Sequence, residues 1–305
     1  MIEGQEGVTW EQWLAIARAC EDSGIEALFR SDHYISFFRP QQAGSLDAWT
    51  TLAGLAAVTT TLRLGTLVSP VTFRHPSLLA RAAVTVDHVS GGRVEVGIGG
   101  GWNVAEHEAF GFAFPETSER MELLAEQTEI VHRQLTEETF DFTGKHYTLK
   151  GSQALPKPVQ RPRPPLVVGG SGRRGTAVPA ARFADEYNTP FVSPEEFARR
   201  RERVRAVCQE LGRDPGSLVF STMTTCTIGD ENARRLYELR SPGDDFDTWR
   251  AKARETTLIG SLDEIAARLR EYEQAGCERV MLQHLLHDDL ETIGAIGREL
   301  APAVA

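Results

Sequence analysis

The chain has 305 residues, of which 41% are hydrophobic and 25% charged, as in ordinary globular proteins. Its 33 Lys and Arg against 43 Asp and Glu leave a net charge of −10, which argues against binding to nucleic acid or to an anionic membrane. Without a signal-peptide pattern, an apolar run of roughly 20 residues, or closely spaced cysteines, the sequence predicts a cytoplasmic protein with reduced thiols.

Helices and strands alternate along the whole chain. Thr9, with Gln12 three residues later, predicts the cap of a first helix, which Gly24 ends before a strand at 25–29. Further helices are predicted at 46–60, 76–90, 118–135, 176–184, 194–211, 261–276 and from about 289 onward. Further strands are predicted at 62–68, 93–98, 165–170, 185–190, 217–229 and 278–284.

This alternation indicates a parallel sheet with helical crossovers. An eighth strand would close a (β/α)₈ TIM barrel, and only Met1 to Gly4 are available for it. We therefore predict a single domain, residues 1–305, that forms a (β/α)₈ barrel with insertions and with its first strand nearly missing. Either the chain is truncated at its start or the barrel closes poorly there. The alternative, an open doubly wound sheet, usually has a G-x-G-x-x-G turn, and "GQEG" does not fit it.

Three segments interrupt the regular pattern. They are "ISFFRPQQAGS" at 35–45, "TFDFTGKHYTLKG" at 139–151, which predicts a β-hairpin, and residues 230–257 with "SPGDDFDTW", which predict a loop and a short helix. On a barrel, long insertions usually serve as lids or walls.

Several strands end on residues that suit chemistry, and active sites of such barrels lie at the carboxyl ends of the strands. The loops Gly99 to Asn103 and Gly169 to Arg173 are rich in glycine, which lets a ligand approach the backbone closely. The second loop precedes a helix, so its N–H groups, together with Arg173 or Arg174, suit an anion. The alternative for both loops is a tight turn with surface arginines.

Asp32 and His33 follow the strand at 25–29 and allow three interpretations. They are acid–base chemistry, a structural pair at a strand end, or metal ligation with partners such as His75 or His284. Metal ligation has no recognisable ligand spacing here, so we predict no metal site.

A series of motifs in order along the chain resembles a known family. The motifs are "LFRSDHY", "GTLVSPVTFRHP", "SGGRVEVGIGGGWNVAEHEAFG", "GKHYTLKG", "LPKPVQRPRPPLVVGG" and "ADEYN". Together they resemble the luciferase-like monooxygenase superfamily, and most closely its branch that uses the deazaflavin coenzyme F420. The resemblance implies a (β/α)₈ barrel with the cofactor in its mouth.

The resemblance also implies roles for individual residues. Asp32 would lie beside the cofactor ring and His33 would handle the proton. A bulge with a non-proline cis peptide would support the ring within Thr66, Leu67 and Val68. The cofactor tail and its phosphate would be held by the two glycine loops, namely Gly99, Gly100, Gly101, Trp102 and Asn103, and Gly169, Gly170, Ser171, Gly172 and Arg173. Sugar-phosphate dehydrogenases of this branch have a glutamate where this chain has Trp102, which argues against a sugar-phosphate substrate.

We therefore expect an F420-dependent oxidoreductase that transfers a hydride between the deazaflavin and a small organic substrate. The alternatives are an FMN-dependent luciferase-like monooxygenase and a non-catalytic flavin- or deazaflavin-binding protein. The resemblance also implies a possible homodimer, although no stretch identifies an interface. The aromatic residues have two interpretations: they form the walls of a substrate site, or they pack in the ordinary core. These residues are Trp10, Trp49, Trp102, Phe37 and Phe38.

Overall fold

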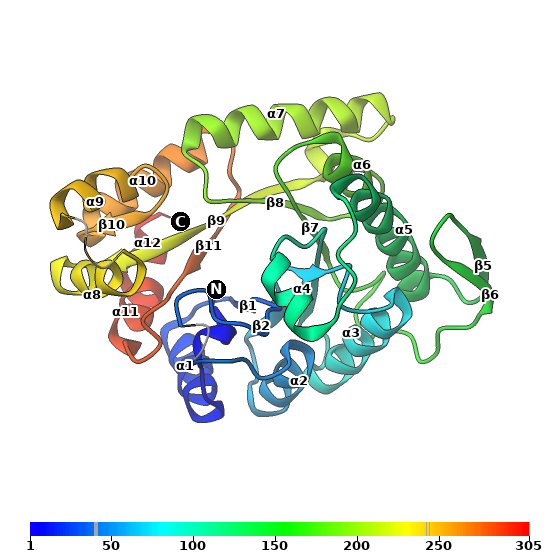
Figure 1. The fold of residues 1–305 in the computed structure, drawn as a ribbon, viewed down its shortest axis with the longest axis horizontal. Coiled ribbons are helices and arrows are strands. Elements are labelled where there is room, and N and C mark those ends of the chain that lie inside the picture. The colour runs from blue at the N-terminus through cyan, green and yellow to red at the C-terminus, as the bar shows by residue number, and fades with distance from the viewer. Residues whose placement is uncertain (40–41, 242, 244, 305) are drawn as a thin grey trace.

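Parallel strands curl around the centre of the molecule and helices lie outside them (Figure 1). The computed structural model describes residues 1–39, 42–241, 243 and 245–304. The strands are, in spatial order, β1 (Ala27–Arg30), β2 (Arg63–Thr66), β4 (Val94–Gly99), β7 (Leu166–Gly169), β8 (Glu186–Pro190), β9 (Val219–Ile228) and β10 (Leu258–Gly260). In addition β11 (Arg279–Gln283) pairs with β9, and the short β3 (Ser69–Pro70) pairs with β4.

The two ends of this sheet are joined through the first two residues of the chain. Ile2 forms parallel bridges with Arg30, at the end of β1, and with His284, after β11. The amino group of Met1 donates a hydrogen bond to the carbonyl oxygen of Leu282 at 2.9 Å. The predicted barrel with a nearly missing first strand is therefore confirmed, and residues 1–2 alone stand in the position of that strand.

The helices cover the outside of the barrel, and the main hydrophobic core lies between them and the strands. The predicted cap of α1 is confirmed, because the side chains of Thr9 and Gln12 each bond the other's backbone N–H. The helices packed around the strands are α1 (Trp10–Ser23), α2 (Ala48–Val58), α3 (Pro76–Ser90), α5 (Thr117–Thr136), α6 (Arg174–Phe183), α7 (Pro194–Glu210), α10 (Leu262–Gln274) and α11 (Leu290–Ala295). Shorter helical turns are η1 (Gly4–Glu6), η2 (Pro215–Ser217), η3 (Ile296–Leu300) and α12 (Ala301–Ala303). Within the described part of the chain, no helix has the length and apolar character needed to cross a membrane.

The insertions agree with the predictions only in part. The hairpin of β5 (Phe140–Thr143) and β6 (Thr148–Ser152) is present. Residues 230–257 hold two helices, α8 (Asp230–Arg240) and α9 (Phe246–Ala253), so the prediction of a loop and one short helix was wrong. Only Ala233 and Leu236 of α8 are buried. Two apolar positions are too few to produce the helical periodicity by which a helix is predicted from sequence. Four residues of the predicted insertions lie outside the described residues. They are Pro40 and Gln41 of "ISFFRPQQAGS", and Pro242 and Asp244 of "SPGDDFDTW".

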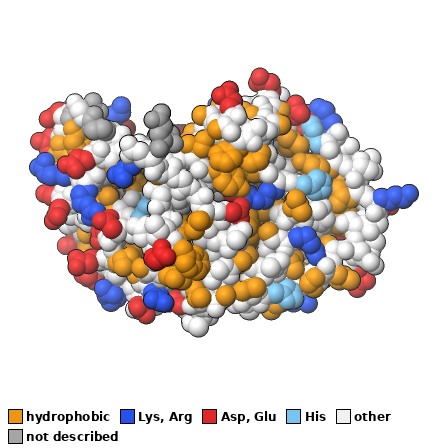
Figure 2. All heavy atoms as spheres, turned by 60° about the horizontal axis from the view of Figure 1, so that its bottom comes forward, with side chains coloured by type: hydrophobic (Ala, Val, Ile, Leu, Met, Phe, Trp, Pro, Cys, Tyr) orange, Lys and Arg blue, Asp and Glu red, His pale blue; other side chains and the backbone are white. Residues whose placement is uncertain are grey.

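The surface combines both signs of charge with one apolar region. Figure 2 shows acidic and basic side chains interspersed over one face, with hydrophobic side chains gathered on a raised part of it. The short helix α4 (Val104–Phe110) and the residue before its cap carry exposed apolar side chains, namely Trp102, Val104 and Phe110. The sequence did not predict this helix.

Candidate active site

The predicted site residues lie at the carboxyl ends of adjacent strands. Asp32 and His33 follow β1, Val68 follows β2, and the two glycine loops begin at Gly99 in β4 and at Gly169 in β7. Because β1, β2, β4 and β7 are parallel neighbours in that order, these ends meet at one rim of the barrel.

The end of β2 carries the backbone feature that the resemblance implied. The peptide bond between Leu67 and Val68 is cis and does not involve a proline. The side chain of Val68 lies against both glycine loops: a Cβ at Gly99 would lie 2.4 Å from its Cγ2, and one at Gly169 would lie 3.1 Å from its Cγ1. These two glycines therefore make room for Val68, which differs from the predicted role as a bare backbone cradle.

Asp32 is fully buried and its carboxylate is fixed at one oxygen. Its Oδ2 accepts hydrogen bonds from Nη1 of Arg74 at 2.5 Å and from Oγ of Ser69 at 2.7 Å. Its Oδ1 is also buried, and among the described residues it has no hydrogen-bond partner. A buried carboxylate oxygen without a donor is costly, so Oδ1 is the natural acceptor for a ligand N–H group.

Arg74 joins Asp32 to a wider network. Its Nη2 donates to Oδ2 of Asp47 at 2.8 Å and to the hydroxyl of Tyr34 at 2.9 Å. Burial alone lowers the pKa of Arg74, but Asp32 and the neighbouring groups raise it above its ordinary value. Burial also raises the pKa of Tyr34 to about 12. The guanidinium therefore stays charged and holds Asp32 in place.

His33 is held by an acid that the sequence did not assign to the site. Its Nδ1 lies 2.7 Å from Oε2 of Glu106, whose carboxyl group is fully buried. Oε1 of Glu106 accepts hydrogen bonds from the backbone N–H groups of Tyr34 and Ile35. Burial raises the pKa of Glu106, but the bonds from His33 and from the two amides outweigh it and lower that pKa. With Nδ1 turned to Glu106, the ring nitrogen that remains for a substrate is Nε2.

Two aromatic rings stand beside His33. The ring of Phe37 is edge-on to it at 4.9 Å between centroids, and that of Trp102 at 5.7 Å. Of the aromatic residues considered as walls, these two lie at the site. Trp49 is instead buried and donates to Oγ of Ser69, and Trp10 packs over Gly54 in α2.

The loop after β7 offers an anion fewer groups than its sequence suggested. The N–H of Gly170 already donates to the carbonyl oxygen of Asn188, and that of Gly172 donates to the hydroxyl of Tyr187. Arg174 pairs with Glu210 through two bonds of 2.6 Å. Arg173, at the cap of α6, is exposed and forms no salt bridge among the described residues, so it and the first turn of α6 can contact an anion.

The other predicted positions lie nearby with less definite roles. Thr66 donates to the carbonyl oxygen of Gly97 and accepts from Ser69. Gly101 has a positive φ of 73°, which only glycine adopts freely. The carbonyl oxygen of Asn103 contacts Nδ1 of His107 at 2.6 Å. Exposed positions on the rim are Trp102 and Ser171.

Sequence reasoning missed Glu106, Arg74 and Ser69. All three lie inside the quoted motifs, but each contacts Asp32 or His33 from a distant segment of the chain. The spacing of residues along the sequence therefore did not reveal these contacts. The signal for Glu106 was an acid in the first turn of a helix after the glycine loop, and that helix was not predicted. Among the described residues, no group of three His, Cys, Asp or Glu side chains is arranged to hold a metal ion.

Comparison with known proteins identifies the family. The family model described as luciferase-like monooxygenase matches residues 2–279. A pyrimidine monooxygenase, RutA from Agrobacterium fabrum (strain C58 / ATCC 33970), is 31% identical over 296 residues, covering 85% of this chain and 78% of RutA.

Two solved structures share the fold. An F420-dependent secondary alcohol dehydrogenase in complex with an F420–acetone adduct has a TM-score of 0.84 at 19% identity, covering 100% of this chain and 98% of that chain. A riboflavin lyase, RcaE, with modified FMN and riboflavin, has a TM-score of 0.76 at 19% identity, covering 96% and 84%. With the family model matching nearly its whole length, this chain belongs to the luciferase-like monooxygenase family.

Proposed function

We propose that this protein, as a single domain of residues 1–305, transfers a hydride between coenzyme F420 and a small organic substrate. The observation that carries the proposal is the buried Oδ1 of Asp32, which has no hydrogen-bond partner in the described part of the chain, beside the pair of His33 and Glu106. It combines an acceptor for a ring N–H with a residue that can move a proton.

Asp32 fits a deazaflavin because the pyrimidine edge of that ring carries an N–H donor. Arg74 and Ser69 hold Oδ2, so Oδ1 is aimed without further reorganisation. Val68 and the Leu67–Val68 peptide would support the ring from the adjacent strand end. Bound F420 supplies the hydride chemistry, and the protein supplies orientation, proton handling and exclusion of water.

His33 would give or take the proton that accompanies hydride movement at a substrate oxygen or carbon. Glu106 orients the imidazole through Nδ1 and leaves Nε2 for the substrate. Phe37 and Trp102 would keep water from the same atom and contact a flat or apolar substrate. At the rim, Arg173 and the first turn of α6 would contact the anionic tail of the cofactor.

A second candidate is an FMN-dependent monooxygenase, and the similarity to pyrimidine monooxygenase RutA favours it. The N–H of a flavin ring would suit Oδ1 of Asp32 equally well, and its single phosphate would suit the α6 terminus. The two candidates differ in the cofactor tail and in the need for oxygen and a source of reduced flavin.

A direct titration separates them. The purified protein is titrated with oxidised F420 and with FMN, each followed by its own fluorescence, and the two are then competed. We expect F420 to bind more tightly, with Asp32→Asn weakening it; tighter binding of FMN would reject the F420 proposal in favour of the monooxygenase. F420 binding without turnover on a broad panel of alcohols, ketones and enones would support a binding protein without catalysis.

A further inference from the structure

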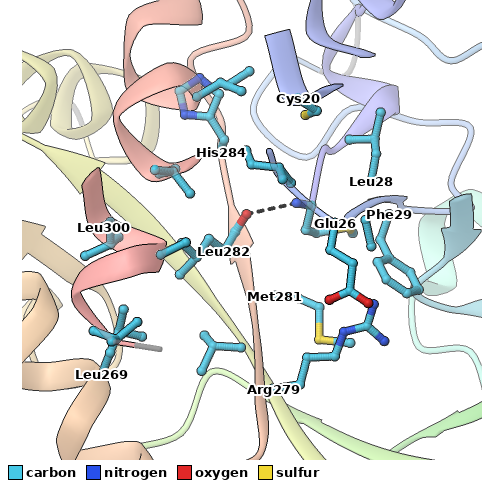
Figure 3. A pocket seen from close by; sticks show the side chains of 18 of the residues that line it. Cys20, Glu26, Leu28, Phe29, Leu269, Arg279, Met281, Leu282, His284 and Leu300 are labelled. Atoms are coloured by element: carbon cyan, nitrogen blue, oxygen red, sulfur yellow. Dashed lines mark hydrogen bonds between the residues drawn. The ribbon is translucent and has the colours of Figure 1, made fainter. Parts of the chain in front are cut away.

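The side chains inside the barrel are arranged in layers. One layer is an apolar cluster to which Phe29, Met223 and Met281 belong and against which Met1 packs. Figure 3 shows the alternation along β11 that produces this arrangement: the side chain of Met281 points to one side of the strand, and that of Leu282 to the other. Residues two positions after the members of the cluster therefore form the next layer toward the carboxyl ends of the strands.

This next layer has a glycine half and a polar half. In the glycine half, Gly99 of β4 and Gly169 of β7 lie against Val68, on the side that we propose holds the cofactor. The polar half consists of four buried residues, namely Glu3, Ser31, Thr225 and Gln283. Because β9, β11, residues 1–2 and β1 pair in that order, these four positions are neighbours around the barrel.

The polar side chains are joined by one chain of hydrogen bonds. Oγ1 of Thr225 donates to Oε1 of Gln283 at 2.5 Å, and Nε2 of Gln283 donates to Oε1 of Glu3 at 2.6 Å. Nε2 of Gln5 donates to Oε2 of Glu3 at 2.7 Å, and Oγ of Ser31 donates to Oε1 of Gln5 at 2.5 Å. Each oxygen of the Glu3 carboxylate therefore accepts a hydrogen bond from a neutral amide.

Arg240 brings a positive charge to the Thr225 end of this chain. It is the last residue of α8, and its Nη1 donates to Oγ1 of Thr225 at 3.4 Å. Although Arg240 is exposed to solvent, the protein around its guanidinium lowers its pKa by desolvation. Among the described residues, Arg240 forms no salt bridge, so no acid of the protein offsets this desolvation there.

Other guanidinium groups of the protein have better partners. Arg235, on the same helix, forms two bonds with Asp288 at 2.8 and 2.7 Å. Arg93 donates to several backbone carbonyl oxygens. Arg240 has one long bond to a neutral hydroxyl, so most of its N–H donors have no protein acceptor in the described part of the chain. A desolvated cation in this situation gains from an anionic ligand.

We propose that the polar half of this layer is the substrate side of the active site, and that Arg240 binds the carboxylate of a small organic substrate. The inference rests on the proposed function, because it places the reacting carbon of the same molecule between the F420 site and His33. A keto acid is the matching class: its carbonyl carbon accepts a hydride from reduced F420 and its oxygen a proton from His33, which gives a hydroxy acid.

The charge and shape of this region favour a carboxylate over a phosphate. A guanidinium presents its donors in a planar fork that matches the two oxygens of a carboxylate. The carboxylate of Glu3 belongs to the same hydrogen-bonded chain as Thr225, the partner of Arg240. A second negative charge on the ligand would be repelled by this buried acid, so a monoanion fits better than a phosphate dianion.

Arg240 would also suit a purely structural role, because a cation near the carboxyl end of a helix interacts favourably with the helix dipole. That role would not distinguish a carboxylate ligand from a neutral amide of the same shape. The test therefore compares keto acids with their primary amides.

The ligands are 2-oxobutanoate, 4-oxopentanoate and 6-oxoheptanoate, each with its matched amide, and inorganic phosphate as a competing anion. Calorimetric titrations use the protein with and without oxidised F420, which cannot reduce a ketone, so turnover does not interfere. The unmodified protein is compared with Arg240→Gln, Arg240→Lys and the matched control Arg235→Gln on the same helix.

We expect at least one keto acid to bind the unmodified protein about tenfold or more tightly than its amide. Arg240→Gln should remove this preference and leave the Kd of the amide nearly unchanged. Arg240→Lys should keep part of the preference, because lysine retains the charge but not the planar fork. Arg235→Gln should keep all of it. Added salt should reduce the preference by screening the charges.

Equal affinity for acid and amide in all three pairs would overturn the proposal, and so would a preference that survives Arg240→Gln. Tighter binding of phosphate than of every keto acid would also overturn it. If Arg240→Gln does not fold, the unmodified protein still provides a readout, since a preference that is the same at low and high salt would contradict an ionic contact.

An F420 titration of every form separates this inference from the proposed function. A preference for the acids without any binding of F420 would reject the proposed function and support the carboxylate site. Normal F420 binding without a preference for the acids would reject the carboxylate site and leave the proposed function in place.

Discussion

The packing of Val68 between the glycine loops leads to a sharp test of how the site is built. Replacing Gly99 by Ala adds one carbon atom that would lie 2.4 Å from Cγ2 of Val68. Carbon atoms in contact are normally about 3.5–4.0 Å apart, so the overlap exceeds 1 Å. A Cβ added at Gly97 or at Gly169 would also lie close to Cγ1 of Val68, at 3.0 and 3.1 Å.

We expect Gly99→Ala to cost about 1–3 kcal/mol of stability, the usual range for an overpacked core. Because Val68 lies at the face that we propose binds the cofactor, we also expect cofactor affinity to fall by about tenfold or more. Adding Val68→Ala removes the methyl groups that clash, so the double variant should recover much of the stability. Thermal unfolding and F420 titration measure the two effects.

The matched control is Gly91→Ala, at the end of α3, where an added Cβ meets no atom within 4 Å. Its φ is +67°, so this variant should lose about 1 kcal/mol of stability while leaving F420 affinity unchanged. If Gly99→Ala binds F420 as the unmodified protein does, or if Val68→Ala fails to restore stability, then Val68 does not connect the two glycine loops as argued.

Four further predictions concern the cofactor and the proton. Arg173→Ala should weaken F420 binding about three- to tenfold at low salt. Arg174→Ala should leave F420 binding unchanged, because the guanidinium of Arg174 is already paired with Glu210 on α7. If Arg173→Ala and the unmodified protein have the same Kd for F420, Arg173 is a surface residue without a role in binding. His33→Ala should lower turnover by about 10²–10⁴ with cofactor affinity within a few-fold, and near-normal turnover would make the histidine structural. Asp32→Asn should instead weaken F420 binding first, by about tenfold or more, as measured by titration; a Kd equal to that of the unmodified protein would contradict its assigned role. Burial raises the pKa of Glu106, but its hydrogen bonds outweigh burial and lower this pKa below its ordinary value. The ionised carboxylate should therefore stabilise the fold above about pH 4.5. This stabilisation should be lost as the pH falls through the lowered pKa. Unfolding midpoints of Glu106→Gln should therefore fall less steeply with acid than those of the unmodified protein, and parallel curves would refute the pairing.

The fold was predictable because its signals are local and repeated. The capping box at Thr9 and Gln12 and the glycine at the end of α1 are read from a few adjacent residues, and the structure confirms them. Alternation of helices and strands then limits the topology to a few choices. The helices in residues 230–257 were misjudged because α8 buries only two apolar residues, too few to produce a helical period.

The candidate site was predictable only where one segment contains the whole signal. Asp32 and His33 were singled out because they directly follow an apolar strand. Glu106 and Arg74 were not found, because their partners lie 73 and 42 residues away and only the closed barrel brings them together. Pairing over such distances has no period and no fixed spacing, so a single sequence does not reveal it.

The two oxygens of Asp32 show why this strand end differs from an ordinary one. Proteins satisfy most buried polar atoms, and Oδ2 follows that rule through Arg74 and Ser69. Oδ1 breaks the rule at the rim where four strands end, beside a histidine already turned by Glu106. A purely structural ion pair would gain from a donor at both oxygens, and a local exception of this kind is expected where a ligand completes the set. We therefore expect the abrupt change from apolar strand to Asp32 and His33 to serve ligand binding, and a titration of Asp32→Asn with F420 and with FMN tests this expectation.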